Sequence, residues 1–266
     1  MKRLMWFCSV LVLVLFTMLQ ADDSSELLTL VDTGYYDLVD AYCSVGYDST
    51  NKNQPIGTRC LDGVDRDGNT AIAIAAMRRN FHIVARLIAA GARLNLVNHK
   101  RETPLMQAAK NGDDRMVQLL FNAGAFVNIQ DVKGRTALMY AAKNGYKSTV
   151  ILLKILGADL SLQDVNGKNA LIHAAKHGHA DIVKILKHSE VDINAAASDD
   201  MTALMYAAQY GHEKVVMALI ALGADLAIVN SQLAKNAAGI ADFFGYTAVA
   251  EILYEAMDTD ALADVD

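Results

Sequence analysis

The sequence predicts an all-α protein that is built from stacked repeats. A seven-residue motif, typified by residues 136–142, begins at Thr70, Thr103, Thr136, Asn169 and Thr202, so each copy starts 33 residues after the last. A constant period of this length is typical of repeat proteins, in which each unit packs against its neighbours. Two further observations support the prediction: a glycine follows each of the last four copies at a fixed distance, and apolar residues then recur at helical spacing.

Each motif predicts a short first helix. Its opening Thr or Asn is a favourable N-cap residue, because the side-chain oxygen accepts a hydrogen bond from the first helical turn. Pro104 or an alanine comes next, and both suit that first turn. Paired alanines near the end of the motif let neighbouring helices approach closely. The glycine that follows suits a tight turn, and it is Gly112, Gly145, Gly178 or Gly211.

A second helix is expected after this glycine. Its apolar residues recur at helical spacing, as in Met116, Val117 and Leu120. It ends at a further glycine, which is followed by a polar turn such as residues 131–135. One unit is therefore a helix, a turn, a second helix and a protruding β-turn that we call a finger. A single unit cannot bury its apolar face, so we expect the units to stack.

The repeated pattern resembles the ankyrin repeat. The family's Gly-x-Thr-Pro-Leu-His-x-Ala-Ala is matched by residues 134–142, its Gly-His turn by residues 178–179 and 211–212, and its Gly-Ala-Asp by residues 157–159. The resemblance covers roughly residues 62–229. It implies an ankyrin-repeat solenoid with five clear repeats and degenerate N- and C-terminal caps. We do not expect the family's Thr–His hydrogen bond, because other residues fill the histidine position: Met106, Met139, Ile172 and Met205.

Residues 1–21 are expected to be a signal peptide. Lys2 and Arg3 precede an apolar run over residues 4–19, which is short for a membrane span. Cleavage before Asp22 is expected, with an uncleaved anchor as the alternative because Leu19 is large for a cleavage site. This predicts an exported protein in the periplasm or cell envelope, with secretion as the alternative.

Three further segments complete the predicted organisation. Residues 22–61 are expected to form a degenerate N-terminal capping repeat with an inserted loop. Cys43 and Cys60 flank this loop, and export favours a disulfide between them over two unpaired thiols. Residues 62–257 form the ankyrin-repeat domain, in which 235–257 is the altered C-terminal cap. Residues 258–266 are expected to be a frayed acidic tail.

Departures from the consensus predict local weakness. Arg79 stands where later repeats carry the inter-helix glycine, Glu190 replaces a terminal glycine, and residues 195–200 lack the finger glycine. A non-glycine residue at such a turn is strained unless the turn changes. We therefore expect the junction between the fourth and fifth repeats to be the least stable, although sequence drift without functional meaning is the alternative.

The resemblance implies a partner-binding concave face that is made by the fingers and the first helices. Positions four, seven and eight after each motif start share a helix face, and the fingers add basic residues. Tyr and Arg are favoured contact residues, and the basic charge would attract an acidic partner protein. The alternative is that the lysines are merely solvated and some tyrosines are packed. The candidate binding residues are Arg66, Arg78, Lys100, Arg101, Gln107, Lys110, Asn111, Lys133, Arg135, Tyr140, Lys143, Asn144, Lys168, His173, Lys176, His177, Tyr206 and Tyr210.

Other function classes are disfavoured. The whole chain has 24 basic and 30 acidic residues, a net charge of −6, which does not suit general nucleic-acid binding. His173 and His177 lie four apart, but two histidines leave metal coordination incomplete. The sequence carries no GxSxG, HExxH or phosphate-binding glycine loop. We therefore expect no enzyme activity, metal or cofactor, and no membrane partner except through an uncleaved signal.

These observations predict a non-enzymatic protein–protein interaction module that is exported to the cell envelope. Two more specific roles remain open from the sequence. The protein could be an immunity or inhibitor protein against a toxic envelope enzyme, or an accessory or metal-delivery protein for an exported enzyme.

Overall fold

The computed structural model describes residues 28, 29, 31, 61–187 and 191–263. Across these residues the regular structure is helical, apart from two isolated β-bridges, Val64–Thr70 and Asn230–Lys235. The all-α prediction is therefore confirmed. The predictions for the signal peptide and for the Cys43–Cys60 disulfide lie outside the described residues. Of residues 22–60, only Leu28, Thr29 and Val31 are described, and Leu28 and Val31 are buried.

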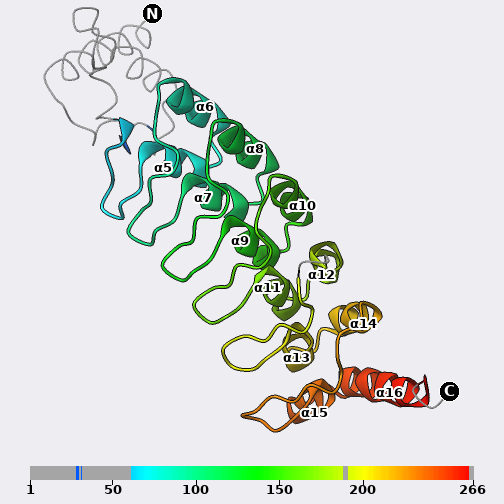
Figure 1. Ribbon diagram of the computed structural model, residues 1–266. Coiled ribbons are helices and arrows are strands. Elements are labelled where there is room, and N and C mark those ends of the chain that lie inside the picture. Colours follow the sequence, from blue (N-terminus) through cyan, green and yellow to red (C-terminus); the bar gives the residue numbers. More distant parts are fainter. Residues whose placement is uncertain (1–27, 30, 32–60, 188–190, 264–266) are drawn as a thin grey trace, which may run out of the picture. The chain divides into compact units, whose positions relative to one another are not determined.

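The chain divides into two compact units, one up to Phe126 and the other from Val127 onwards. The described helices of the first unit are α5 (Ala71–Met77), α6 (Phe81–Ala89), α7 (Pro104–Lys110) and α8 (Asp114–Asn122). The first helices α5 and α7 pack side by side, and each also packs on the second helix of its own repeat, as Figure 1 shows.

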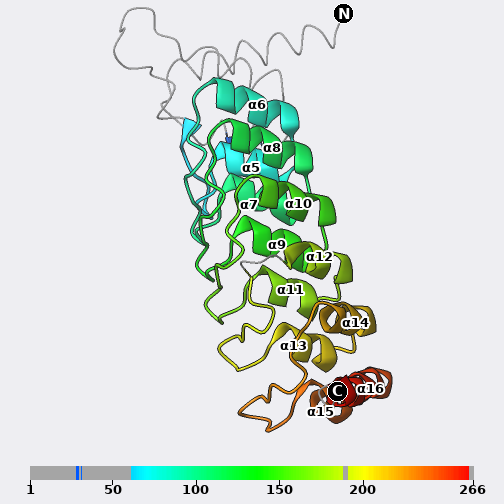
Figure 2. The same cartoon turned by 45° about the vertical axis from the view of Figure 1, so that its right-hand side comes forward.

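The second unit repeats the same arrangement. Its helices are α9 (Ala137–Asn144), α10 (Lys147–Ile155), α11 (Ala170–Lys176), α12 (Ala180–Leu186), α13 (Ala203–Gln209), α14 (Glu213–Ala221), α15 (Ala237–Phe243) and α16 (Thr247–Ala263). The first helices α9, α11, α13 and α15 form one row, and the second helices form another (Figures 1 and 2). The fingers extend beyond the first helices, on the side away from the second helices.

The first helices begin where the motif predicts. The side-chain oxygen of Thr136 accepts a hydrogen bond from the backbone N–H of Met139 at 3.3 Å, and that of Asn169 accepts one from Ile172 at 2.9 Å. These bonds satisfy N–H groups that have no partner within the helix. The residues at the family's histidine position, Met139 and Ile172 among them, are buried, so apolar packing occupies that place.

Glycine and histidine join successive repeats in the second unit. Gly145 has φ +82°, and the ring of His179 from the next repeat lies against it. A Cβ at Gly145 would lie 2.6 Å from Cε1 of His179, which leaves no room for a side chain. The Nε2 of His179 donates to the carbonyl of Lys143 at 3.0 Å. His212 repeats this contact on Gly178, so the Gly-His turn is an inter-repeat joint as well as a turn.

The strain predicted at two of the three consensus departures is confirmed, and the third departure, Glu190, lies outside the described residues. Arg79 has φ +60° and Asp200 has φ +54°, both in the left-handed region that disfavours residues with a Cβ. Two further residues share this conformation, namely Arg101 at φ +58° and Ala234 at φ +50°. Each of these backbone positions would therefore be less strained with glycine.

The junction after the fourth repeat is also irregular. The second helix α12 has seven residues, whereas α10 and α14 have nine each. Lys187 follows α12 in an extended conformation, φ −63° and ψ +103°, in place of a glycine turn. A shorter helix buries less apolar surface against its neighbours. The predicted weakness of this junction stays a prediction.

Residues 258–266 were expected to be a frayed acidic tail, and this stays a prediction. Helix α16 continues to Ala263, and residues 264–266 lie outside the described residues. The helix is 17 residues long, so it extends past the predicted end of the capping repeat at residue 257 without a break.

Candidate protein-binding face

The fingers and first helices of each unit form the surface on which the candidate residues lie, and we call this surface the finger face. On the first unit, the candidate side chains that are exposed are Arg66, Arg78, Lys100 and Arg101. On the second unit, Lys133, Asn144 and Tyr210 are exposed. The candidates with intermediate exposure are Lys110, Asn111, Arg135, Lys143, Lys168, Lys176 and His177.

Four candidates are buried, which corrects the expectation that they form part of an outward surface. They are Gln107, Tyr140, His173 and Tyr206, which stand four residues after the start of their motifs. For the two tyrosines, the alternative that they are packed is therefore the correct one. Helix periodicity places residues on a common side of the helix, but it does not determine which of them the finger covers.

Each of these four side chains donates a hydrogen bond to a carboxylate in its own finger. The hydroxyl of Tyr140 donates to Asp131 at 2.5 Å, and Nε2 of His173 donates to Asp164 at 3.0 Å. The other two bonds are Tyr206 to Asp199 at 2.5 Å and Gln107 to Glu102 at 2.8 Å. We call this bond between finger and first helix the finger clasp.

The clasp carboxylate also shapes the finger itself. One oxygen of Asp131 accepts the backbone N–H groups of Lys133 and Arg135, both at 2.8 Å, while the other oxygen accepts the Tyr140 hydroxyl. Asp164 binds Asn166, Lys168 and His173 in the same way. Each aspartate therefore fixes the finger turn and ties it to the first helix.

The fifth repeat makes the clasp differently. Ala197 stands where Asp131 and Asp164 stand in earlier repeats, so no carboxylate is available at that position. The hydroxyl of Tyr206 donates instead to Asp199, two residues further along. The second oxygen of Asp199 is buried and has no hydrogen-bond partner among the described residues. Burial, followed by the Asp199 hydrogen bond, raises the pKa of Tyr206, which keeps its hydroxyl protonated.

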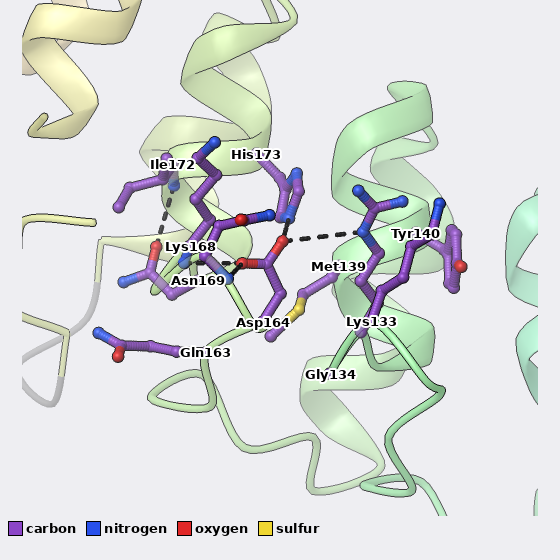
Figure 3. A network of polar contacts seen from close by, with 12 residues as sticks. Lys133, Gly134, Met139, Tyr140, Gln163, Asp164, Lys168, Asn169, Ile172 and His173 are labelled. Atoms are coloured by element: carbon purple, nitrogen blue, oxygen red, sulfur yellow. Dashed lines mark hydrogen bonds and ion pairs between the residues drawn. The ribbon is translucent and has the colours of Figure 1, made fainter. Parts of the chain in front are cut away.

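The clasp at His173 contains a buried ionisable group. Oδ2 of Asp164 lies 3.0 Å from Nε2 of His173, as Figure 3 shows. The same oxygen lies 3.7 Å from Nε of Arg135. Burial lowers the pKa of His173 to about 4, because the loss of hydration outweighs the attraction of Asp164. His173 is therefore neutral at pH 7 and uses its Nε2–H as the donor. Its Nδ1 is buried without a hydrogen-bond partner among the described residues.

Some candidate basic residues form ion pairs within the chain. Lys110 lies 2.5 Å from Glu102, and Arg135 is the partner of Asp164. Burial alone would raise the pKa of Glu102, but the hydrogen bond and charge of Lys110 outweigh it and lower that pKa. Lys168 and Lys176 have different surroundings. Their ammonium groups lie 4.9 Å and 5.2 Å from the centre of the Tyr206 ring, and Lys176 also lies 5.3 Å from that of Tyr210.

The two histidines that share a helix face have their own partners. The rings of His173 and His177 are 6.4 Å apart, and Nδ1 of His177 donates to the carbonyl of His173 at 2.9 Å. Burial is the main reason that the pKa of His177 is lowered. Within residues 61–187 and 191–259, no cluster of three or more metal-ligating side chains is found.

The clasp was missed, although the sequence contains its signal. In the third and fourth repeats an aspartate stands nine residues before the donor, Asp131 before Tyr140 and Asp164 before His173. These two pairs are 33 residues apart, whereas Gln107 and Tyr206 bond to carboxylates at other positions, Glu102 and Asp199. A repeated pair of complementary polar residues, one on the finger and one on the helix, predicts contact between finger and helix.

Comparison with known proteins supplies a family match. The family model described as ankyrin repeats (3 copies) matches residues 27–131, 72–164 and 138–230. These overlapping matches span most of the chain. No match was found among curated proteins. None of the described helices combines the length and the hydropathy that a bilayer span requires.

Proposed function

Because the chain belongs to the ankyrin-repeat family, whose repeats are generally protein–protein interaction modules and typically non-enzymatic, we propose that it binds an acidic partner protein through its finger face. We further propose that the protein is exported and acts in the cell envelope, as the basic start and apolar run of residues 1–21 suggest. The role as an inhibitor of an envelope enzyme, or as an accessory protein, would be a special case of this binding.

The separation of charge on the second unit is the observation that carries the proposal. The clasp carboxylates Asp131 and Asp164 are buried and turned towards their own fingers. On the same two fingers, Lys133 is exposed and Lys168 is half-buried. Although the chain as a whole is acidic, these fingers therefore present positive charge. Such a surface favours the approach of an acidic partner and disfavours a basic one.

Affinity capture tests the proposal. The chain without residues 1–21 is used to capture partners from the envelope fraction of its own cells, and the bound proteins are identified by mass spectrometry. Reversal of the finger charges in the double variant Lys133→Glu and Lys168→Glu should reduce capture by at least about tenfold, since it places like charges opposite an acidic partner.

A matched control carries the same charge change on the second helices. Lys184 and Lys214 are exposed on α12 and α14, so Lys184→Glu with Lys214→Glu should leave capture unchanged. Equal losses in both double variants would show that overall charge, rather than the finger face, governs binding. Capture that neither variant alters would refute the proposal. If the captured partner is an enzyme that the chain inhibits, the inhibitor role is favoured.

A further inference from the structure

The finger face of the second unit changes its chemistry along the repeats. Seven residues after the motif start stand Lys143, Lys176 and Gln209, and the same position in the last repeat is Phe243. At the eighth position the sequence runs Asn144, His177, Tyr210 and then Phe244. The rows therefore begin with basic and amide side chains and end with aromatic ones.

The aromatic side chains at the C-terminal end are exposed. Tyr210 is 42% exposed, Phe243 62%, Phe244 43% and Tyr246 40%, and we call these four residues the aromatic patch. A terminal repeat is expected to present polar residues to solvent. Large apolar side chains that gather on a surface mark interaction sites, so the aromatic patch indicates that this repeat binds a partner.

Side-chain contacts connect part of the patch to the basic rows. The ammonium of Lys176 lies 5.3 Å from the centre of the Tyr210 ring. The ring of Tyr246 lies against Gly211, the residue that follows Tyr210, so closely that a Cβ there would be 2.3 Å from Cδ1. Phe243 and Phe244 stand three and two residues before Tyr246 in the sequence, and their rings meet edge to face at 5.2 Å. Contacts thus connect Lys176 to Tyr210 and Tyr246 to the neighbouring Gly211, and Phe243 and Phe244 belong to the same repeat as Tyr246.

Two nearby carboxylates, Asp199 and Asp242, accept hydrogen bonds from tyrosine hydroxyls. Asp199 accepts from Tyr206, and Asp242, beside Phe243, accepts from Tyr254 at 2.7 Å. The lysines of this region lie over aromatic rings instead. Lys176 lies over Tyr206 and Tyr210, and Lys235 lies 6.0 Å from the centre of the Phe243 ring. A cation over an aromatic face can still accept a carboxylate from its open side, so the surface suits a ligand that carries negative charge at one end.

We propose that this surface binds an extended peptide segment of the partner, with an acidic end at Lys176 and an apolar end on the aromatic patch. The inference rests on the proposed function and specifies the partner's chemistry. Neighbouring helices pack about 10 Å apart, so two repeats from Lys176 to Phe244 span about 20 Å. An extended chain covers that distance in about six residues. The segment therefore carries its acidic and apolar residues about six positions apart.

Selection from a random twelve-residue peptide library on phage, with the full chain as bait, tests this inference. Enriched peptides should carry an acidic block and an apolar or aromatic block, in one order and about six residues apart. A fluorescein-labelled copy of an enriched peptide is then titrated by anisotropy. Phe244→Ser and Lys176→Glu should each weaken its binding by roughly tenfold, because each removes one of the two anchoring contacts of the peptide.

Ile155→Ser is the matched control, because Ile155 is 75% exposed but lies at the end of the second helix α10. It should leave peptide binding unchanged, and circular dichroism verifies that all three variants are folded. A peptide of the same composition with its acidic and apolar residues interleaved should bind at least about tenfold more weakly. It cannot place an acidic end at Lys176 and an apolar end on the aromatic patch at the same time.

Three results would overturn the inference. The first is that no peptide is enriched, or that enriched peptides lack the two blocks. The second is that Phe244→Ser binds as well as the control. The third is that vesicles of phosphatidylcholine and phosphatidylglycerol, and not peptides, bind in a manner that depends on Phe243 and Phe244. If capture of the natural partner is lost with the Lys133 and Lys168 reversal but survives Phe244→Ser, the proposed function stands and this inference fails.

Discussion

A histidine at position 173 replaces the tyrosine that the third and fifth repeats carry at the same place, Tyr140 and Tyr206. All three residues are buried and donate to a finger carboxylate. Tyrosine makes this bond without changing charge near neutral pH, whereas the imidazole ring titrates. The exchange of one donor for another therefore gives one clasp a dependence on pH that the other two lack.

His173 should make the second unit sensitive to mild acid. Its pKa is about 4 in the folded chain, against an ordinary value of 6.5, because burial disfavours the charged ring. Unfolded His173 takes up a proton as the pH falls below 6.5, while the folded residue stays neutral down to about 4. Folding stability is therefore lost between pH 6.5 and pH 4, by up to about 3 kcal/mol.

The variant His173→Tyr should remove this loss, since the introduced hydroxyl can donate to Asp164 as Tyr140 does to Asp131. Urea denaturation at pH 7 and pH 4.5 measures the difference. The wild-type chain should lose about 2 kcal/mol more than the variant over this interval. An equal loss in both chains would mean that His173 does not titrate as described.

The backbone strain at Ala234 can be tested by its effect on stability. Ala234 has φ +50°, a conformation that costs an alanine about 1 kcal/mol and a glycine almost nothing. Ala234→Gly should therefore stabilise the chain by about 0.5 to 1 kcal/mol. Ala256→Gly, inside helix α16, is the matched control and should destabilise the chain by about 1 kcal/mol. Thermal melts of the two variants provide the test. If both melting temperatures shift in the same direction, the strain assigned to Ala234 is contradicted.

At the scale of the element, the finger clasp explains how a loop outside the helical rows keeps a fixed shape. The carboxylate of Asp131 is buried and accepts two backbone N–H groups as well as the Tyr140 hydroxyl. A loop that is held this way loses little conformational entropy when a partner binds, which favours affinity.

Removing one donor should show the contribution of the clasp. Tyr140→Phe takes away the hydroxyl and leaves a buried carboxylate with one hydrogen bond fewer, at a cost of about 2 kcal/mol. Tyr146→Phe removes a hydroxyl from an exposed tyrosine and should change stability by less than about 0.5 kcal/mol. Chemical denaturation measures the free energy of unfolding of both variants. If the two variants lose a similar amount of stability, a clasp of this strength is refuted.

The elements themselves were largely predictable from the sequence. Thr136 and Asn169 begin their helices as N-caps, and Gly145 ends one in the left-handed conformation, because these effects depend on local backbone chemistry. Burial of Tyr140 and His173 was not predictable from helix periodicity, since it depends on a carboxylate in a preceding loop. The aromatic patch was missed because Phe243 and Phe244 lie where the motif has diverged most from the other repeats.

At the scale of the whole molecule, the predicted ankyrin-repeat architecture is confirmed by the helical structure and by the family match. Stability in such an array is approximately a sum of repeat and interface contributions, so one weak junction can open by itself. The short helix α12 and the strained Asp200 lie on either side of the junction between the fourth and fifth repeats.

Native-state hydrogen exchange should detect this junction. Backbone amides of α12 and of the finger that follows it should exchange faster than those of α10 and α14, because the interface buries less surface and opens more readily. Peptide-resolved mass spectrometry of the free chain provides the rates. Uniform protection from α10 to α14 would contradict the expected weakness.

The same method, applied to the complex with a captured partner, tests the central claim most directly. Binding through the finger face should slow exchange in the fingers and in first helices such as α11, α13 and α15. It should leave the second helices α10 and α14 unchanged. Slower exchange confined to the second helices would contradict the account, because the partner would then occupy the opposite side of each repeat.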